Sequence, residues 1–138
     1  MRLSKTKAAC VTLCAFGLGL VTTNSASAAG WTYGAYEGGG YGVWNYDPGP
    51  DPIGFGDAPG DAIAACDIKA DGWGIEVRLD IGRDGDIDRT VSTRGHSSPY
   101  CSDYKTGDIS PEGTPVRVWV VKVKGDTDYH PVYKDGNA

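Results

Sequence analysis

Four aspartates gather in a short stretch of the chain and are the best candidates for chemistry. They are Asp80, Asp84, Asp86 and Asp88. In the hairpin that we expect here, Asp80 lies opposite Asp88 on the solvent face, where like charges destabilise strand pairing. The neighbouring Arg78 and Arg83 would neutralise them, and so would Ca²⁺, which takes several carboxylate and carbonyl oxygens. The cluster indicates either local ion pairs or a calcium site.

The spacing of these aspartates resembles only the start of an EF-hand loop, over Asp84-Gly-Asp-Ile-Asp88. Arg89 stands where that loop needs glycine, and Gly95 stands where it needs a bidentate glutamate. We therefore expect no EF-hand, and no cofactor apart from calcium at the four aspartates.

His96, followed by Ser97 and Ser98, is the one pattern that suggests a hydrolase. A catalytic triad is a matter of spatial geometry, and the strand-to-helix motif that exposes a nucleophilic serine is absent from this sequence. A polar loop histidine explains the same residues. We expect a protein that is not an enzyme, with a secreted hydrolase using His96 as an alternative.

Residues 29–58 differ in composition from the rest of the chain. They contain nine glycines and seven aromatic residues but no Lys or Arg. The glycines argue against a regular core element, so we expect a glycine- and aromatic-rich arm. Flat aromatic faces supply large contact areas for a sugar ring or a partner protein. The predicted ligand-binding residues are Trp31, Tyr36, Tyr41 and Trp44. The alternative is that these rings pack against the rest of the protein.

The stretch Trp31-Thr-Tyr-Gly34, directly after a signal-like segment, resembles the opening of the lactococcin 972-type bacteriocins. Those proteins are small β-sandwiches that act on cell-wall synthesis. The resemblance covers Gly30 to Gly34, and the pair Cys66 and Cys101 does not belong to the family's pattern. It implies a bacteriocin-like activity as an alternative function. We assign none of the family's functional residues to positions in this sequence.

Residues 1–28 predict a secretory signal, with a basic start, an apolar stretch and the small-residue site Ala26-Ser27-Ala28. Cleavage after Ala28 lowers the count of Lys and Arg from 13 to 10 against 18 Asp and Glu, which leaves a net charge of −8. An acidic domain offers little to a phosphate backbone, so we expect no nucleic-acid partner. We also expect no membrane insertion after cleavage. The expected location is extracellular in a bacterium, either free or associated with the cell wall, and the oligomeric state stays open.

Only Cys66 and Cys101 remain after the predicted cleavage. Two cysteines in an exported chain predict one structural disulfide, because no Cys-x-x-Cys redox motif is present and Cys66 is expected to face the core.

The segment Ile63 to Arg94 predicts three antiparallel strands. Apolar residues occupy every second position from Trp73 to Ile81, with Glu76, Arg78 and Asp80 between them, which is typical of a strand with one buried face. Asp71-Gly72 predicts a two-residue hairpin turn that sets Cys66 opposite Val77.

The turn after Ile81 predicts a three-residue loop, Arg83-Asp84-Gly85, with Gly85 in the left-handed conformation. This register sets Ile81 opposite Ile87, Val77 opposite Val91 and Leu79 opposite Arg89. Arg89 then lies on the apolar face and is expected to extend toward its rim.

The last third of the chain predicts a strand over 116–124 that is apolar on both faces. It also predicts a short strand over 129–133, which Pro131 keeps at the edge of a sheet. The chain is therefore expected to be all-β: an antiparallel β-sandwich or barrel of about six strands over residues 59–138, with one disulfide. The predicted function is a secreted, non-enzymatic module that binds cell-wall or environmental polysaccharide or a protein. A small bacteriocin-like or inhibitor protein is the alternative.

Overall fold

The computed structural model describes residues 29–138, so the predicted signal peptide, residues 1–28, lies outside the described part. All regular elements in that part are strands. They are β1 (Gly30–Gly34), β2 (Gly40–Asn45), β3 (Gly49–Pro50), β4 (Asp57–Ala58), β5 (Ala62–Asp67), β6 (Gly74–Ile81), β7 (Arg89–Ser92), β8 (Tyr100–Cys101), β9 (Pro115–Lys124) and β10 (Thr127–Asn137). The described residues contain no helix long and apolar enough to cross a bilayer.

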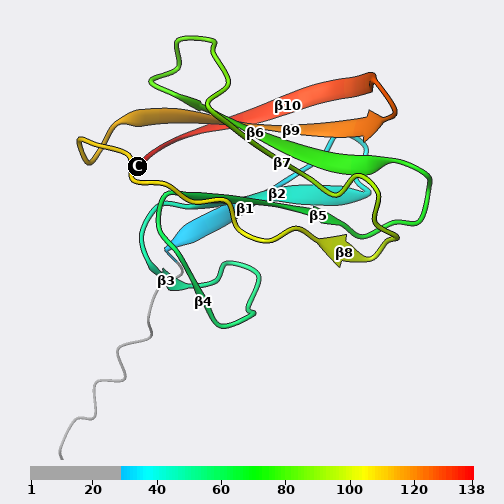
Figure 1. Ribbon diagram of the computed structural model, residues 1–138, viewed down its shortest axis with the longest axis horizontal. Coiled ribbons are helices and arrows are strands. Elements are labelled where there is room, and N and C mark those ends of the chain that lie inside the picture. The colour runs from blue at the N-terminus through cyan, green and yellow to red at the C-terminus, as the bar shows by residue number, and fades with distance from the viewer. Residues whose placement is uncertain (1–28) are drawn as a thin grey trace, which may run out of the picture.

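Two antiparallel four-stranded sheets form the two layers of the molecule (Figure 1). The lower layer has the order β1-β2-β5-β8 and the upper layer the order β10-β9-β6-β7, while β3 and β4 form a separate hairpin below the lower layer. The predicted all-β class is confirmed, as an open arrangement of two sheets rather than a closed barrel.

The core lies between the layers and is built mainly from alternate residues of the long strands. The upper sheet supplies Ile75, Val77 and Leu79 from β6 and Val116, Val118 and Val120 from β9. The lower sheet supplies Trp44, Ile63 and Ala65. Burial of this apolar surface is the main favourable free energy of folding.

The segment 29–58 forms strands β1 and β2 of the lower sheet rather than an irregular arm. Trp31 pairs with Trp44, and β2 pairs along its whole length with β5. Glycine is tolerated here because the layers approach closely: a Cβ on Gly40 would lie 2.4 Å from Cγ1 of Ile75. The glycines that argued against a core element are therefore a consequence of tight packing.

The predicted hairpin at Asp71-Gly72 is wrong, because β5 and β6 belong to different sheets. All six residues of β5 are buried, so this strand has no solvent face to set a register with β6. The carboxylate of Asp67 accepts a hydrogen bond from Lys69 N, and that of Asp71 accepts one from Trp73 N, both at 3.0 Å. These bonds bend the chain into a crossover between the layers.

The second predicted register is confirmed where β7 exists: Val77 pairs with Val91 and Leu79 with Arg89. The pair Ile81–Ile87 does not form, because β7 begins only at Arg89. Gly85 has the expected positive φ of 97°, but the connecting loop spans residues 82–88.

Arg89 does not extend to the rim as expected. Its guanidinium donates to the carbonyls of Asp61 and Gly107, at 2.6 and 2.5 Å, and so ties the upper sheet to the chain around the lower one.

At the end of the chain, β10 is an edge strand with a register shift between Tyr129 and Val132, next to Pro131, as that proline predicted. The strand is longer than the expected 129–133.

Candidate functional site

The structure does not bring together on one surface the four aromatic residues that the sequence singled out. Trp44 is fully buried and its Nε1 donates to Asn137 O at 3.3 Å, so it offers no face to a ligand. Trp31 packs beside it on the same face, with Lys134 Nζ 4.5 Å from its ring centre. Tyr41 is three residues from Trp44 along β2, so it projects from the opposite face of the sheet. Tyr36 lies at one end of the molecule, in the turn after β1.

The four aspartates serve the loop 82–88 instead of converging on one point. Asp80 is 2% exposed, and its carboxylate accepts from the amides of Asp84 and Gly85 at 3.1 and 3.2 Å. Asp88 accepts from Ile81 N at 2.7 Å, and Asp84 from Asp86 N at 2.9 Å. The expected facing pair of Asp80 and Asp88 is not part of the sheet, because β7 begins at Arg89 and its pairing with β6 ends at Leu79–Arg89. Within residues 29–138, no three His, Cys, Asp or Glu side chains are placed to hold a metal ion.

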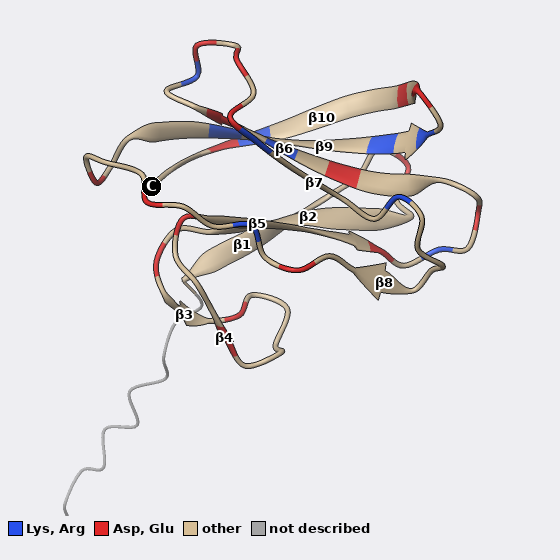
Figure 2. Ribbon diagram, viewed as in Figure 1, with Lys and Arg blue, Asp and Glu red and all other residues tan. Residues whose placement is uncertain are grey.

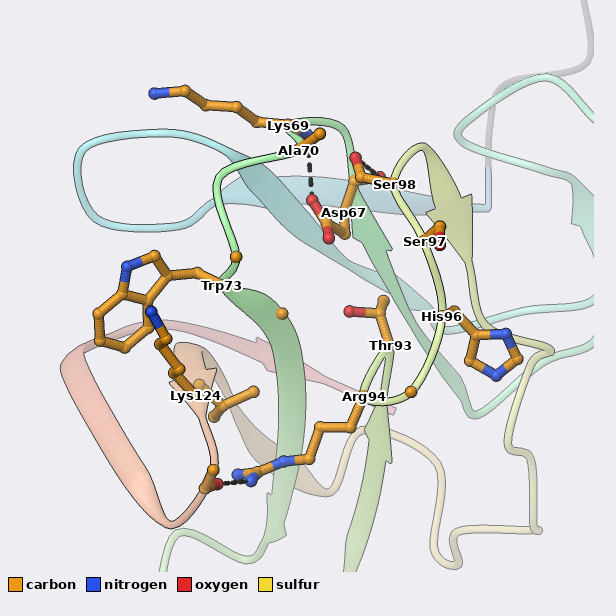
Figure 3. Close-up of a pocket in the computed structure, with 15 residues that line it drawn as sticks. Asp67, Lys69, Ala70, Trp73, Thr93, Arg94, His96, Ser97, Ser98 and Lys124 are labelled. Atoms are coloured by element: carbon orange, nitrogen blue, oxygen red, sulfur yellow. Dashed lines mark hydrogen bonds between the residues drawn. The ribbon is translucent and has the colours of Figure 1, made fainter.

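The predicted disulfide is confirmed: Cys66 and Cys101 are bonded, and they face each other across β5 and β8. The bond fixes the position of the loop that contains His96. The imidazole of His96 stacks on Tyr100, with ring centres 3.7 Å apart. Figure 3 shows this side chain on the far side of its loop from Trp73 and Asp67.

A pocket of about 530 Å³ lies at the end of the sandwich, and we call it the crossover pocket. Three segments line it: the β5–β6 crossover (67–74), the loop after β7 (93–98) and the β9–β10 turn (123–125). Figure 3 shows Asp67, Ser98 and Thr93 on one side of the pocket and Trp73 on the other, with its indole next to the end of the Lys124 side chain.

Hydrogen bonds hold the polar groups of the crossover pocket in place. Ser98 Oγ donates to Asp67 O at 3.3 Å, and Thr93 Oγ1 accepts from Ile75 N at 2.9 Å. Arg94 donates to Gly125 O across the pocket mouth. Carboxylate, hydroxyl and cationic groups thus line one concave surface.

Arg94 belongs to an ion-pair network on the neighbouring face of the upper sheet. It pairs with Glu76 at 3.2 Å, and Arg78 pairs with both Glu76 and Asp128. The hydrogen bond from Arg78 lowers the pKa of Asp128 below its usual value, and that same bond raises the pKa of Arg78. This network keeps the Arg94 guanidinium at the pocket mouth.

An aromatic cluster adjoins the pocket. Trp73 lies 5.4 Å from the ring of Tyr129, and His130 stacks on Tyr36 at 4.4 Å. Lys124 Nζ lies 5.7 Å from the Trp73 ring. The negative charge of Glu37 raises the pKa of Tyr129, whose hydroxyl donates to that carboxylate at 3.4 Å.

Of the four predicted aromatic residues, only Tyr36 belongs to this cluster. The sequence predicted that Trp73 faces the core of a hairpin. That prediction assumed that the segments of β5 and β6 pair with each other, and because they do not, it missed the position of Trp73 at the pocket. The nearest sequence signal is the turn residue Asp71 two positions earlier.

No protein-family model, no curated protein and no solved structure matches this chain. The resemblance to lactococcin 972-type bacteriocins therefore rests on Gly30 to Gly34 alone.

Proposed function

We propose that this protein is a secreted, non-enzymatic carbohydrate-binding module, and that a saccharide binds in the crossover pocket against Trp73. The observation that supports this proposal is a half-buried indole on the wall of a cavity of about 530 Å³ whose other walls carry fixed polar groups. Sugar rings combine apolar C–H faces, which pack on aromatic rings, with hydroxyls that need hydrogen-bond partners. A concave site of this volume suits a small ring system better than a flat protein surface.

Charge favours a saccharide with acidic substituents. The lining residues include three cations, Lys69, Arg94 and Lys124, and one carboxylate, Asp67. Arg94 is paired with Glu76 and Lys69 with Asp71. The positive charge available to a ligand is therefore mainly that of Lys124, beside the Trp73 ring. Residues 29–138 carry a net charge of −8, so Lys124 is a local positive charge on an otherwise acidic domain. Acidic cell-wall polysaccharide is therefore the ligand class that fits best, because anionic groups would find a cation here and repulsion elsewhere.

The test is co-sedimentation with purified bacterial cell wall, chitin and insoluble cellulose, with Trp73→Ala beside Tyr133→Ala. Tyr133 is a matched control, because it is an aromatic residue 45% exposed on a different surface. We expect retention on at least one matrix, strongest on cell wall, that is lost in Trp73→Ala and kept in Tyr133→Ala. Equal retention of the two variants, or no retention of the unaltered protein, would contradict the proposal.

Secretion has its own test, since it rests on residues outside the described part. Mass spectrometry of protein exported by a bacterial host should give a chain that begins at Ala29. A product that stays in the cytoplasm with residues 1–28 attached would remove this part of the proposal.

A further inference from the structure

Four aromatic rings gather beside the crossover pocket and form a surface that continues outside it. This aromatic cluster consists of Tyr36, Trp73, Tyr129 and His130. Its rings come from the β1–β2 turn, the β5–β6 crossover and the start of β10, three segments that Figure 1 shows at the same end of the sandwich. None of the four residues belongs to the hydrophobic core between the sheets. The cluster therefore needs an explanation other than core packing.

The rings of the cluster are open to solvent although they contact one another. Tyr36 is 40% exposed, His130 is exposed, and Trp73 and Tyr129 are half-buried. The rings of Tyr36 and His130 stack with their centres 4.4 Å apart, and that of Trp73 lies 5.4 Å from Tyr129. Aromatic rings that already hold one another in place lose little conformational entropy when a ligand packs on them. The cluster is thus a preformed contact surface.

The backbone of β10 is bent in a way that brings these rings together. Consecutive side chains of a regular strand point to opposite faces, yet Tyr129 and His130 both contact Tyr36, with ring centres at 6.1 and 4.4 Å. The register shift between Tyr129 and Val132, with a φ of +40° at His130, accompanies this arrangement. A positive φ is unfavourable for a residue other than glycine, and such strain is concentrated at ligand-binding sites. This strain therefore points to a binding role for the cluster.

Polar groups of both signs border the cluster. Tyr129 OH donates to Glu37 Oε2 at 3.4 Å, and Lys124 Nζ lies 5.7 Å from the centre of the Trp73 ring. Sugar hydroxyls need such donors and acceptors, while the C–H face of a sugar ring packs on an aromatic ring. The exposed carboxylate of Glu37 repels an acidic sugar, whereas Lys124, which also lines the crossover pocket, attracts one. The charges therefore favour a neutral sugar over the cluster and an acidic sugar at the pocket.

Trp73 belongs to both the crossover pocket and the aromatic cluster, so the two surfaces are continuous. We propose, building on the saccharide site assigned above, that the ligand is a linear glycan in which acidic and neutral sugars alternate. Its acidic sugar lies in the crossover pocket beside Lys124. The chain continues across Trp73, and its next neutral sugar packs on Tyr36 and His130. The protein thus recognises an extended chain rather than a single sugar.

The test is isothermal titration calorimetry of residues 29–138 with glycan fragments of bacterial cell wall that carry no peptide. These fragments alternate neutral N-acetylglucosamine with acidic N-acetylmuramic acid, and the disaccharide, tetrasaccharide and hexasaccharide are compared. We expect the affinity to rise about 10-fold from the disaccharide to the longer fragments, the size of effect expected for one added aromatic contact.

Two variants remove rings of the cluster that do not line the pocket, His130→Gly and Tyr36→Ala. Glycine adopts the positive φ of position 130 without strain, so the first variant removes the ring and leaves the backbone path intact. Both variants should bind the disaccharide as the unaltered protein does and lose the gain for longer fragments. Trp73→Ala should weaken binding of every fragment, because this ring belongs to both surfaces. Thermal melting verifies that each variant is folded.

The matched control is Tyr133→Ala. Tyr133 also lies on β10 and is 45% exposed, but its ring contacts Trp119 instead of the cluster. This variant should keep the full dependence on fragment length. Trp73-dependent binding of the disaccharide with no gain on lengthening, or a gain that survives in His130→Gly and Tyr36→Ala, would overturn this inference and leave the proposed function standing. Failure of the unaltered protein to bind any fragment would overturn both.

Discussion

The two sheets of this sandwich share one apolar core, but their strands differ strongly in the number of charged residues. The strands of the lower sheet contain one charged residue, Asp67, while those of the upper sheet contain ten. Figure 2 shows this contrast as tan strands below and red and blue bands above. The upper sheet has a solvent face with ion pairs, whereas the two central strands of the lower sheet, β2 and β5, are buried on nearly all of both faces.

The cover of the lower sheet comes from its own connections. Asn45, fully buried, donates from Nδ2 to the carbonyls of Asp47 and Pro59 at 2.7 and 2.8 Å, which holds the segment 47–60 against the sheet. The disulfide adds a covalent link along its edge. We therefore expect the stability of the lower sheet to depend on close contacts and cross-links. The stability of the upper sheet should depend on burial of its alternating apolar residues, with a small contribution from ion pairs.

The largest expected effect is loss of the disulfide. Replacement of both Cys66 and Cys101 by alanine should lower the free energy of unfolding by about 4 kcal/mol, because a loop closed over 35 residues of separation restricts the unfolded chain. Urea unfolding with and without reductant measures this difference. A loss below about 1 kcal/mol would mean that the covalent link contributes little to the lower sheet.

Next in size is Gly40→Ala in β2. The new Cβ would lie 2.3 Å from Cys66 O and 2.4 Å from Ile75 Cγ1, so strands must shift, and we expect a loss of about 3 kcal/mol. Gly34→Ala in the neighbouring strand is the matched control, because nothing lies within 4 Å of its Cβ. Equal unfolding midpoints for the two variants would show that the layers are less closely packed than the structure indicates.

A smaller effect is expected from Arg78→Ala on the upper sheet. It removes ion pairs to Glu76 and Asp128, and since Arg78 and Asp128 are partly exposed we expect a loss of about 1 kcal/mol at low salt. Molar salt should reduce the difference between variant and unaltered protein, because it screens surface charges. A salt-independent loss would point instead to packing of the arginine side chain.

The smallest effect is the pH dependence of the same network. The pKa of Asp128 is lowered in the folded state by the hydrogen bond from Arg78, so its contribution is present above the unfolded-state pKa, about 3.9. That contribution is lost as the pH falls through the lowered folded-state pKa. Unfolding curves of Arg78→Ala and the unaltered protein should therefore converge in strong acid. A difference that stays constant down to the lowest pH would contradict the assigned role of Asp128.

Local alternation was enough to predict parts of the upper sheet. The alternating residues of β6, with Val77 facing Val91, required only that one face be buried and the other wet, since a slip of one residue would expose every apolar side chain. The class of the fold and the disulfide followed from similarly simple constraints, namely strand periodicity and two cysteines in a chain with a signal-like start.

The tertiary structure decided the rest, because the missing information concerned contacts between distant segments. Strand β5 has small or apolar residues on both faces, so its own sequence does not indicate which sheet it joins. Burial of Trp44 depends on its pairing with Trp31 and on the opposing sheet, and the exposure of Trp73 depends on the crossover that carries the chain between layers. A residue's own type and spacing determine which faces it can occupy, whereas its contact with core or solvent is set by elements far away in the sequence.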